Sequence, residues 1–159
     1  MQNLPANFIT SEAKLNEVLD WLQKQEFVFY DIETSGLDAS KDCVIGFGIS
    51  GFTNGYYLPL EQYSVDYDCL QSLPGQKSLA VTLLNALQKK AICTFNGAFD
   101  IPFTTKKLNI DLLASLHTDV LLLKHTVDEE FPFKLKEIAV QVFGYGAASE
   151  QRDLQAELK

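Results

Sequence analysis

Two acidic residues, Asp31 and Glu33, stand one residue apart directly after a run of large β-forming residues, Phe27–Tyr30. That run carries no charge and is typical of a strand buried on both faces. In an extended chain residues i and i+2 share a face, so the two carboxylates point the same way. A divalent cation would offset their repulsion, because Mg²⁺ and Mn²⁺ favour oxygen ligands. The alternative is a solvated pair of acids in the loop after the strand.

A third carboxylate, Asp100, follows Asn96 by four residues. Both come after the short apolar stretch Ala91–Phe95, which is predicted to be a strand reached through a crossover helix. If this strand is a parallel neighbour of the first, Asp100 lies in the first turn of the next helix and faces Asp31 and Glu33. The alternatives are that Asp100 complements the helix dipole and that Asn96 caps the end of the strand.

The elements that must position these residues alternate between helices and strands. Apolar residues recur at helical spacing in some segments, and short runs of β-formers mark others. The predicted helices are 10–25, 78–90, 99–108, 120–127 and 133–143; the predicted strands are 26–32, 43–50, 56–60, 91–95 and 112–117. The turn Thr53–Gly55 makes the first three strands an antiparallel meander. This order predicts an α/β protein with a mixed sheet.

Local signals refine the helices and the segments between them. Pro102 fits only the first turn of its helix, and residues 61–77 are predicted to be a loop, with a polar tail from residue 147. The predicted helix caps are Thr10 or Ser11, Ser78, and Thr118 or Asp119. The predicted inward stripe of the last helix is Leu135, Ile138, Ala139 and Val142.

The composition is that of a soluble globular protein, with 159 residues, 47% hydrophobic and 21% charged. A formal net charge of −8 argues against a general, free-standing nucleic-acid binder, whose surface is normally basic. It is compatible with an enzyme that meets phosphate through bound metal. The widely spaced Cys43, Cys69 and Cys93, with two His, argue against a zinc site and fit a reducing cytosol. No signal peptide or membrane span is predicted, so the expected location is cytoplasmic.

Two segments resemble motifs of a known nuclease family. Asp-Ile-Glu-Thr-Ser-Gly-Leu at 31–37 and Asn-Gly-Ala-Phe-Asp at 96–100 resemble the first two motifs of DEDD-type 3′–5′ exonuclease domains. The resemblance is closest to the proofreading domain of family-A DNA polymerases, where the motifs read DxET and NxxxD. His117–Leu122 and Phe133–Ala139 look like later helices of that family. The similar segments cover most of Phe27–Tyr145 in the same order.

This resemblance implies a ribonuclease-H-like fold and removal of nucleotides from the 3′ end of single-stranded DNA with two Mg²⁺ or Mn²⁺ ions. Two such ions can activate a water and stabilise the leaving oxygen. The implied catalytic metal ligands are Asp31, Glu33 and Asp100, and the implied substrate contacts are Thr34, Leu37 and Asn96. Leu37 would be an apolar wedge beside the terminal base, against the alternative of a turn residue folded into the core. A polymerase domain in the same or another chain is the implied partner.

The family's third motif, YxxxD or HxxxxD, is absent from this sequence. Tyr145 is followed four residues later by Ser149, and His125 is followed by Glu130, which comes too early in the family's order. The motif is therefore expected beyond Lys159, and residues 1–159 are interpreted as a single exonuclease-like domain truncated before its fourth carboxylate. One ion would then be weakly held. The alternatives are a module without catalysis, acting in binding or assembly, and a split enzyme completed by another chain.

Other polar residues are secondary candidates. Asp119 is a possible further ligand, although its counterpart in the family is mainly structural and Asp commonly caps helices. The basic clusters Lys106-Lys107, Lys124-His125 and Lys134-Lys136 are candidates for contacts with a phosphate backbone. For each pair taken singly, a solvated helix face is the favoured interpretation.

Overall fold

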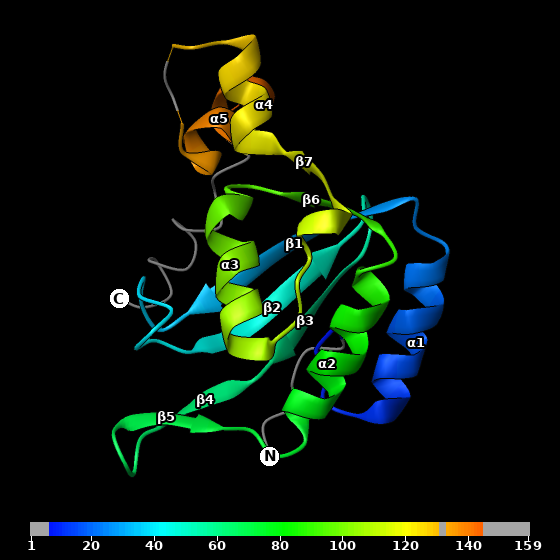
Figure 1. Cartoon of the computed structure of the whole chain (residues 1–159), viewed down its shortest axis with the longest axis vertical. Coiled ribbons are helices and arrows are strands. Elements are labelled where there is room, and N and C mark those ends of the chain that lie inside the picture. Colours follow the sequence, from blue (N-terminus) through cyan, green and yellow to red (C-terminus); the bar gives the residue numbers. More distant parts are fainter. Residues whose placement is uncertain (1–6, 131–132, 145–159) are drawn as a thin grey trace. The chain divides into compact units, whose positions relative to one another are not determined.

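The computed structural model describes residues 7–130 and 133–144, which fall into two compact units, one ending at Asp119 and the other beginning at Val120. The first unit contains a five-stranded sheet in the order β3-β2-β1-β6-β7 (Figure 1). Its strands are β1 (Phe27–Thr34), β2 (Val44–Ser50), β3 (Gly55–Pro59), β6 (Ala91–Thr94) and β7 (Leu116–Asp119). The first three pair in antiparallel fashion, and β1, β6 and β7 run parallel. The predicted α/β class and the antiparallel meander are confirmed.

Side chains of the central strand β1 alternate between the two faces of the sheet. Val28, Tyr30 and Ile32 are buried in the core, whereas Asp31 and Glu33 point to the opposite face and are exposed. The core is completed by helices α1 (Glu12–Gln23), α2 (Gln76–Leu87) and α3 (Gly97–Leu108), of which α2 and α3 lie over one face of the sheet (Figure 1). The alternation of β1 therefore separates core side chains from the candidate ligands.

Helix starts differ from two of the predictions. The Ser11 hydroxyl caps α1 as expected, accepting a hydrogen bond from the Lys14 N–H at 3.2 Å. Helix α2 instead begins after Gly75, whose φ of 79° only glycine adopts easily, so Ser78 lies inside the helix and is not its cap. Helix α3 begins at Gly97, which leaves Pro102 beyond the first turn.

Two segments were predicted wrongly. Residues 61–77 contain a β-hairpin, β4 (Glu61–Ser64) and β5 (Cys69–Ser72), in place of a loop. Its strands are short and polar, so hydrophobic alternation gave no signal. Residues Leu113–Ser115 form a turn of 3₁₀-helix, and β7 begins only at Leu116.

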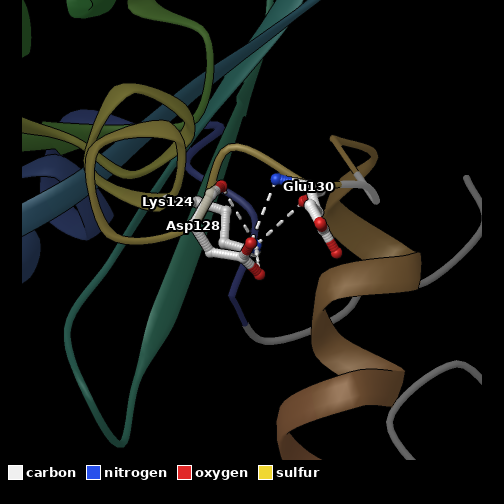
Figure 2. A network of polar contacts seen from close by, with 3 residues as sticks. All are labelled: Lys124, Asp128 and Glu130. Carbon is white, nitrogen blue, oxygen red and sulfur yellow. Dashed lines mark hydrogen bonds and ion pairs between the residues drawn. The ribbon is translucent and has the colours of Figure 1, made fainter.

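The second unit contains helices α4 (Val120–Val127) and α5 (Leu135–Phe143). Figure 2 shows the Lys124 ammonium between Asp128, whose Oδ2 lies at 2.5 Å, and the Glu130 carbonyl at 3.4 Å. These bonds fix the chain that leaves the last turn of α4. In α5 Ile138 is buried, but Leu135 and Val142 are 52% and 63% exposed, so half of the predicted inward stripe is wrong.

None of the described helices is both long and apolar enough to cross a bilayer. The predictions for Tyr145 and for the polar tail lie outside the described residues.

Candidate functional site

The candidate site lies where β1 extends past its parallel neighbour. Pairing between β1 and β6 ends at Phe29 and Cys93, but β1 continues to Thr34. The N–H of Ile32 has no strand partner on that side and donates a hydrogen bond to the Asp100 carboxylate. The early end of β6 therefore brings the first turn of α3 against the acidic end of β1, as the sequence predicted for Asp100.

Asp100 is a buried acid, with 3% of its surface exposed. Its Oδ2 atom has no hydrogen-bond partner among the described residues. Burial, followed by the charges of Asp31 and Asp119, raises the pKa of Asp100 to about 7. An unpaired carboxylate oxygen, shielded from water and close to like charges, is costly unless a cation neutralises it.

A buried chain of hydrogen bonds ties Asp100 to β1. The Thr104 hydroxyl donates to the Asp100 carbonyl oxygen at 2.7 Å, and its oxygen lies 2.7 Å from the Tyr30 hydroxyl. Since the single proton of Thr104 is used on Asp100, Tyr30 must be the donor of the second bond. Burial raises the pKa of Tyr30, so it stays protonated. Because Tyr30 directly precedes Asp31, these hydrogen bonds fix the backbone of Asp100 relative to that of Asp31.

Asp31 and Glu33 share the exposed face of β1. Although the Asp31 side chain is exposed, partial desolvation of its carboxylate raises its pKa, and the charge of Glu33 raises it further. A bulge interrupts the pairing of β1 with β2 between Glu33 and Thr34, where the partner shifts from Gly46 to Val44. Such bulges re-aim side chains beside functional sites.

The start of α3 is held by Asp119. Its two carboxylate oxygens accept hydrogen bonds from the backbone N–H groups of Asn96, at 3.0 Å, and Gly97, at 2.8 Å. Asn96 has a φ of 68° and no side-chain capping bond, and its side chain is exposed. A Cβ at Gly97 would lie 2.4 Å from the Thr94 hydroxyl, so only glycine permits this close turn. Asp119 thus has a bracing role at α3, which favours the structural interpretation over the ligand one.

The loop after β1 carries the expected substrate contacts. The Thr34 hydroxyl donates to the Gly36 carbonyl at 2.8 Å, which shapes the turn. Leu37 is 86% exposed, so the alternative that it folds into the core is wrong. Lys106 of α3 donates to the Ser40 hydroxyl at 2.6 Å and links this loop to the helix that carries Asp100.

The donor set fits a hard divalent cation. Asp31, Glu33 and Asp100 offer only carboxylate oxygens, and the charges of Asp31 and Glu33 act on the Asp100 carboxyl, whose Oδ2 is unpaired. Within residues 7–130 and 133–144, no three His, Cys, Asp or Glu side chains are already arranged as a ready-made metal cage.

Sequence reasoning missed Tyr30 and Thr104, because a hydrogen bond between residues 74 positions apart leaves no local signal. Of the candidate basic residues, Lys124 forms an ion pair with Asp128, which directly follows its own helix.

The chain matches one protein family in sequence and several solved structures in fold. Residues 28–156 match the RNase_H superfamily. The EXO domain of Nibbler from Aedes aegypti aligns with a TM-score of 0.63 and 14% identity, over 91% of this chain and 72% of that one. NrnC from Brucella melitensis aligns with a TM-score of 0.58 and 19% identity, over 86% and 58% of the two chains. The catalytic core of RRP6 from Trypanosoma brucei aligns with a TM-score of 0.60 and 13% identity, over 86% of this chain and 33% of that one.

These likenesses concern the fold, since every identity is below one fifth. The chain spans little more than half of the NrnC chain and a third of the RRP6 core. No protein of curated function matches the sequence.

Proposed function

Because this chain belongs to the RNase_H superfamily, we propose that it is a metal-dependent 3′–5′ exonuclease domain that shortens single-stranded DNA from its 3′ end. The observation that carries the proposal is Asp100, a buried acid with one unpaired oxygen, placed at the end of the strand that presents Asp31 and Glu33. That arrangement is typical of a site that binds cations and not of a structural core.

Asp31, Glu33 and Asp100 would hold Mg²⁺ or Mn²⁺. When bound, such ions supply Lewis-acid stabilisation of the phosphoryl oxygens and lower the pKa of a bound water. The remaining work falls to the protein. The Tyr30–Thr104 link fixes Asp100 against β1, Asp119 fixes the start of α3, and the exposed Leu37 is available to pack on the terminal base.

The solved structures lend support to the metal and to a nucleotide ligand. One structure of NrnC contains bound Mg²⁺, and another is bound to pGG. The finer proposal, proofreading beside a polymerase domain, is supported by the segments at 31–37 and 96–100.

A 5′-labelled single-stranded DNA tests the activity and its polarity. With Mg²⁺ or Mn²⁺, we expect a ladder that shortens from the 3′ end, and no products with EDTA. Asp31→Asn and Asp100→Asn should each lower the rate by at least about 100-fold, since oxygen ligands are lost where charge develops. Asp20→Asn, on the exposed face of α1, is the matched control and should cleave like the wild type. Cleavage that survives Asp31→Asn would exclude the assigned site.

Two further comparisons between substrates test the finer proposal. Proofreading predicts faster removal of a mismatched than of a paired 3′ nucleotide from a primer–template duplex, because the mismatch frays more readily. It also predicts a preference for DNA over RNA of the same sequence. Equal rates on all of them would support a general 3′ exonuclease instead.

The second candidate is an exonuclease-like module without catalysis, which acts in binding or assembly. It is favoured by the lack of a ready-made three-ligand cage among the described residues and by the net charge of −8. Calorimetry separates the two: Mn²⁺ binding without cleavage by the full chain supports the module, and binding with cleavage supports the enzyme.

A further inference from the structure

A tyrosine two strands away from the candidate ligands reaches toward them across glycines. Asp31 pairs with Gly48 of β2, and Gly48 pairs with Tyr57 of β3. Paired residues of neighbouring strands lie on the same face of a sheet, so Tyr57 shares the exposed face of Asp31. In the next row Glu33 pairs with Gly46. Since both residues between these acids and β3 are glycine, no side chain separates Tyr57 from β1.

The tyrosine ring lies over Gly46. A Cβ at Gly46 would lie 2.3 Å from the Tyr57 hydroxyl oxygen and 2.5 Å from its Cζ, whereas a Cβ at Gly48 would meet only a carbonyl oxygen at 3.9 Å. The side chain therefore leans from its own row toward the row of Glu33. Its hydroxyl stands about one strand spacing, roughly 4.8 Å, from β1.

The backbone of Tyr57 is held on its outer side. Its carbonyl accepts a hydrogen bond from the Ile9 N–H at 2.8 Å, and its N–H donates to the Asn7 carbonyl at 3.1 Å. The Phe8 ring lies against the Tyr57 ring, with 5.4 Å between centroids. An ordered, ring-packed tyrosine presents its hydroxyl with little loss of side-chain entropy on binding.

The hydroxyl itself is available to a ligand. The residue is half-buried, and its hydroxyl has no hydrogen bond to any part of the chain that the structure describes. Burial and the charge of Glu33 both raise the pKa of Tyr57, so it is a neutral donor at physiological pH.

We propose that Tyr57 is a substrate-contacting residue, whose hydroxyl hydrogen-bonds the 3′-hydroxyl of the terminal nucleotide. This inference rests on the proposed 3′–5′ exonuclease function. With the scissile phosphate at Asp31 and Asp100, the terminal sugar must extend to one side. The surface above Gly48, beside Asp31, is free of contacts that a Cβ there would meet closer than 3.9 Å, and the Tyr57 ring over Gly46 bounds it.

Tyr57→Phe, which removes one oxygen atom, tests the contact, and Tyr56→Phe is its matched control. Tyr56→Phe removes the same oxygen atom one residue away, on the opposite face of the sheet. There the Tyr56 ring packs on the Trp21 ring, with 4.9 Å between centroids. Each protein is assayed on oligonucleotides that end in a 3′-hydroxyl or in a 3′-deoxy sugar, with kcat, KM and the equilibrium Kd measured separately.

We expect Tyr57→Phe to lower kcat/KM about 3- to 10-fold on the 3′-hydroxyl substrate, the size of one neutral hydrogen bond. It should have no effect on the 3′-deoxy substrate, which the wild type already binds without that bond. Tyr56→Phe should match the wild type on both. A purely structural role of Tyr57 would lower activity on both substrates equally, and that outcome would overturn the inference, as would no change on either.

If the wild type cleaves neither substrate, the proposed exonuclease function is contradicted, but the proposed Tyr57 contact is not. The Kd values, measured in Mn²⁺, then decide the contact. A Tyr57→Phe penalty confined to the 3′-hydroxyl oligonucleotide supports it, and equal Kd values contradict it.

Discussion

Among single residues, Asp100 carries an electrostatic cost in the folded chain, because its buried carboxylate faces Asp31 and Asp119 with one oxygen unpaired. The pKa of Asp100 is about 7 in the folded protein, against 3.8 for an ordinary Asp. At a pH between these two pKa values, Asp100 is therefore protonated in the folded state and ionised in the unfolded state. Stability is consequently lost as the pH rises from about 4 to about 7.

We therefore predict that Asp100→Asn stabilises the protein at pH 8 in the absence of divalent ions. The gain in the free energy of unfolding should be up to about 4 kcal/mol, which is three pKa units converted at about 1.4 kcal/mol each. It should shrink as the pH falls and disappear near pH 4, where wild-type Asp100 is protonated. Urea unfolding at pH 8, 6 and 4, with Asp20→Asn as control, measures it. A variant less stable than the wild type at pH 8 would contradict the assigned cost.

At the scale of elements, the glycines of β2 make opposite predictions. A Cβ at Gly46 would meet the Leu58 carbonyl oxygen at 2.7 Å as well as Tyr57, whereas Gly48 has open space. Gly46→Ala should lower the free energy of unfolding by about 1–3 kcal/mol through overpacking. Gly48→Ala should be neutral or slightly stabilising, since it reduces the entropy of the unfolded chain. Chemical denaturation of both variants gives the comparison, and equal effects would show that the close approach at Gly46 relaxes freely.

Elements were predictable where local chemistry agrees with the tertiary structure. The apolar run of β1 and the turn at Thr53–Gly55 specify the meander, and Asn96 to Asp100 locates the start of α3 within two residues. The start of α2 was predicted at Ser78, which is wrong because Gly75, with its positive φ, precedes the helix without a side-chain cap.

The site was predictable only in part. Asp31 and Glu33 are visible because they follow the apolar run of β1, and Asp100 because it lies in the first turn of the helix after β6. The Tyr30–Thr104 link and the position of Tyr57 depend on strand register and on contacts far apart in the sequence. A single sequence contains no direct signal for either.

For the whole molecule, a net charge of −8 and a cluster of acids predict that divalent cations stabilise the fold. Mg²⁺ at ten times its Kd should add about 1.4 kcal/mol, which raises Tm by roughly 3–6 °C. Because the chain has one tryptophan, Trp21, its fluorescence reports the first unit alone. NaCl at matched ionic strength controls for screening. Asp100→Asn should lose most of the shift, and an undiminished shift would place the ion elsewhere.

The bridge between residues 7–9 and Tyr57 makes an early part of the chain a mechanical support for the proposed sugar contact. A deletion through Phe8 would remove the Phe8 ring and the Asn7 carbonyl from the outer side of Tyr57, while leaving the buried Ile9 and every acid in place. Such a protein should still bind metal, but its affinity for the 3′ end of the substrate should be lower.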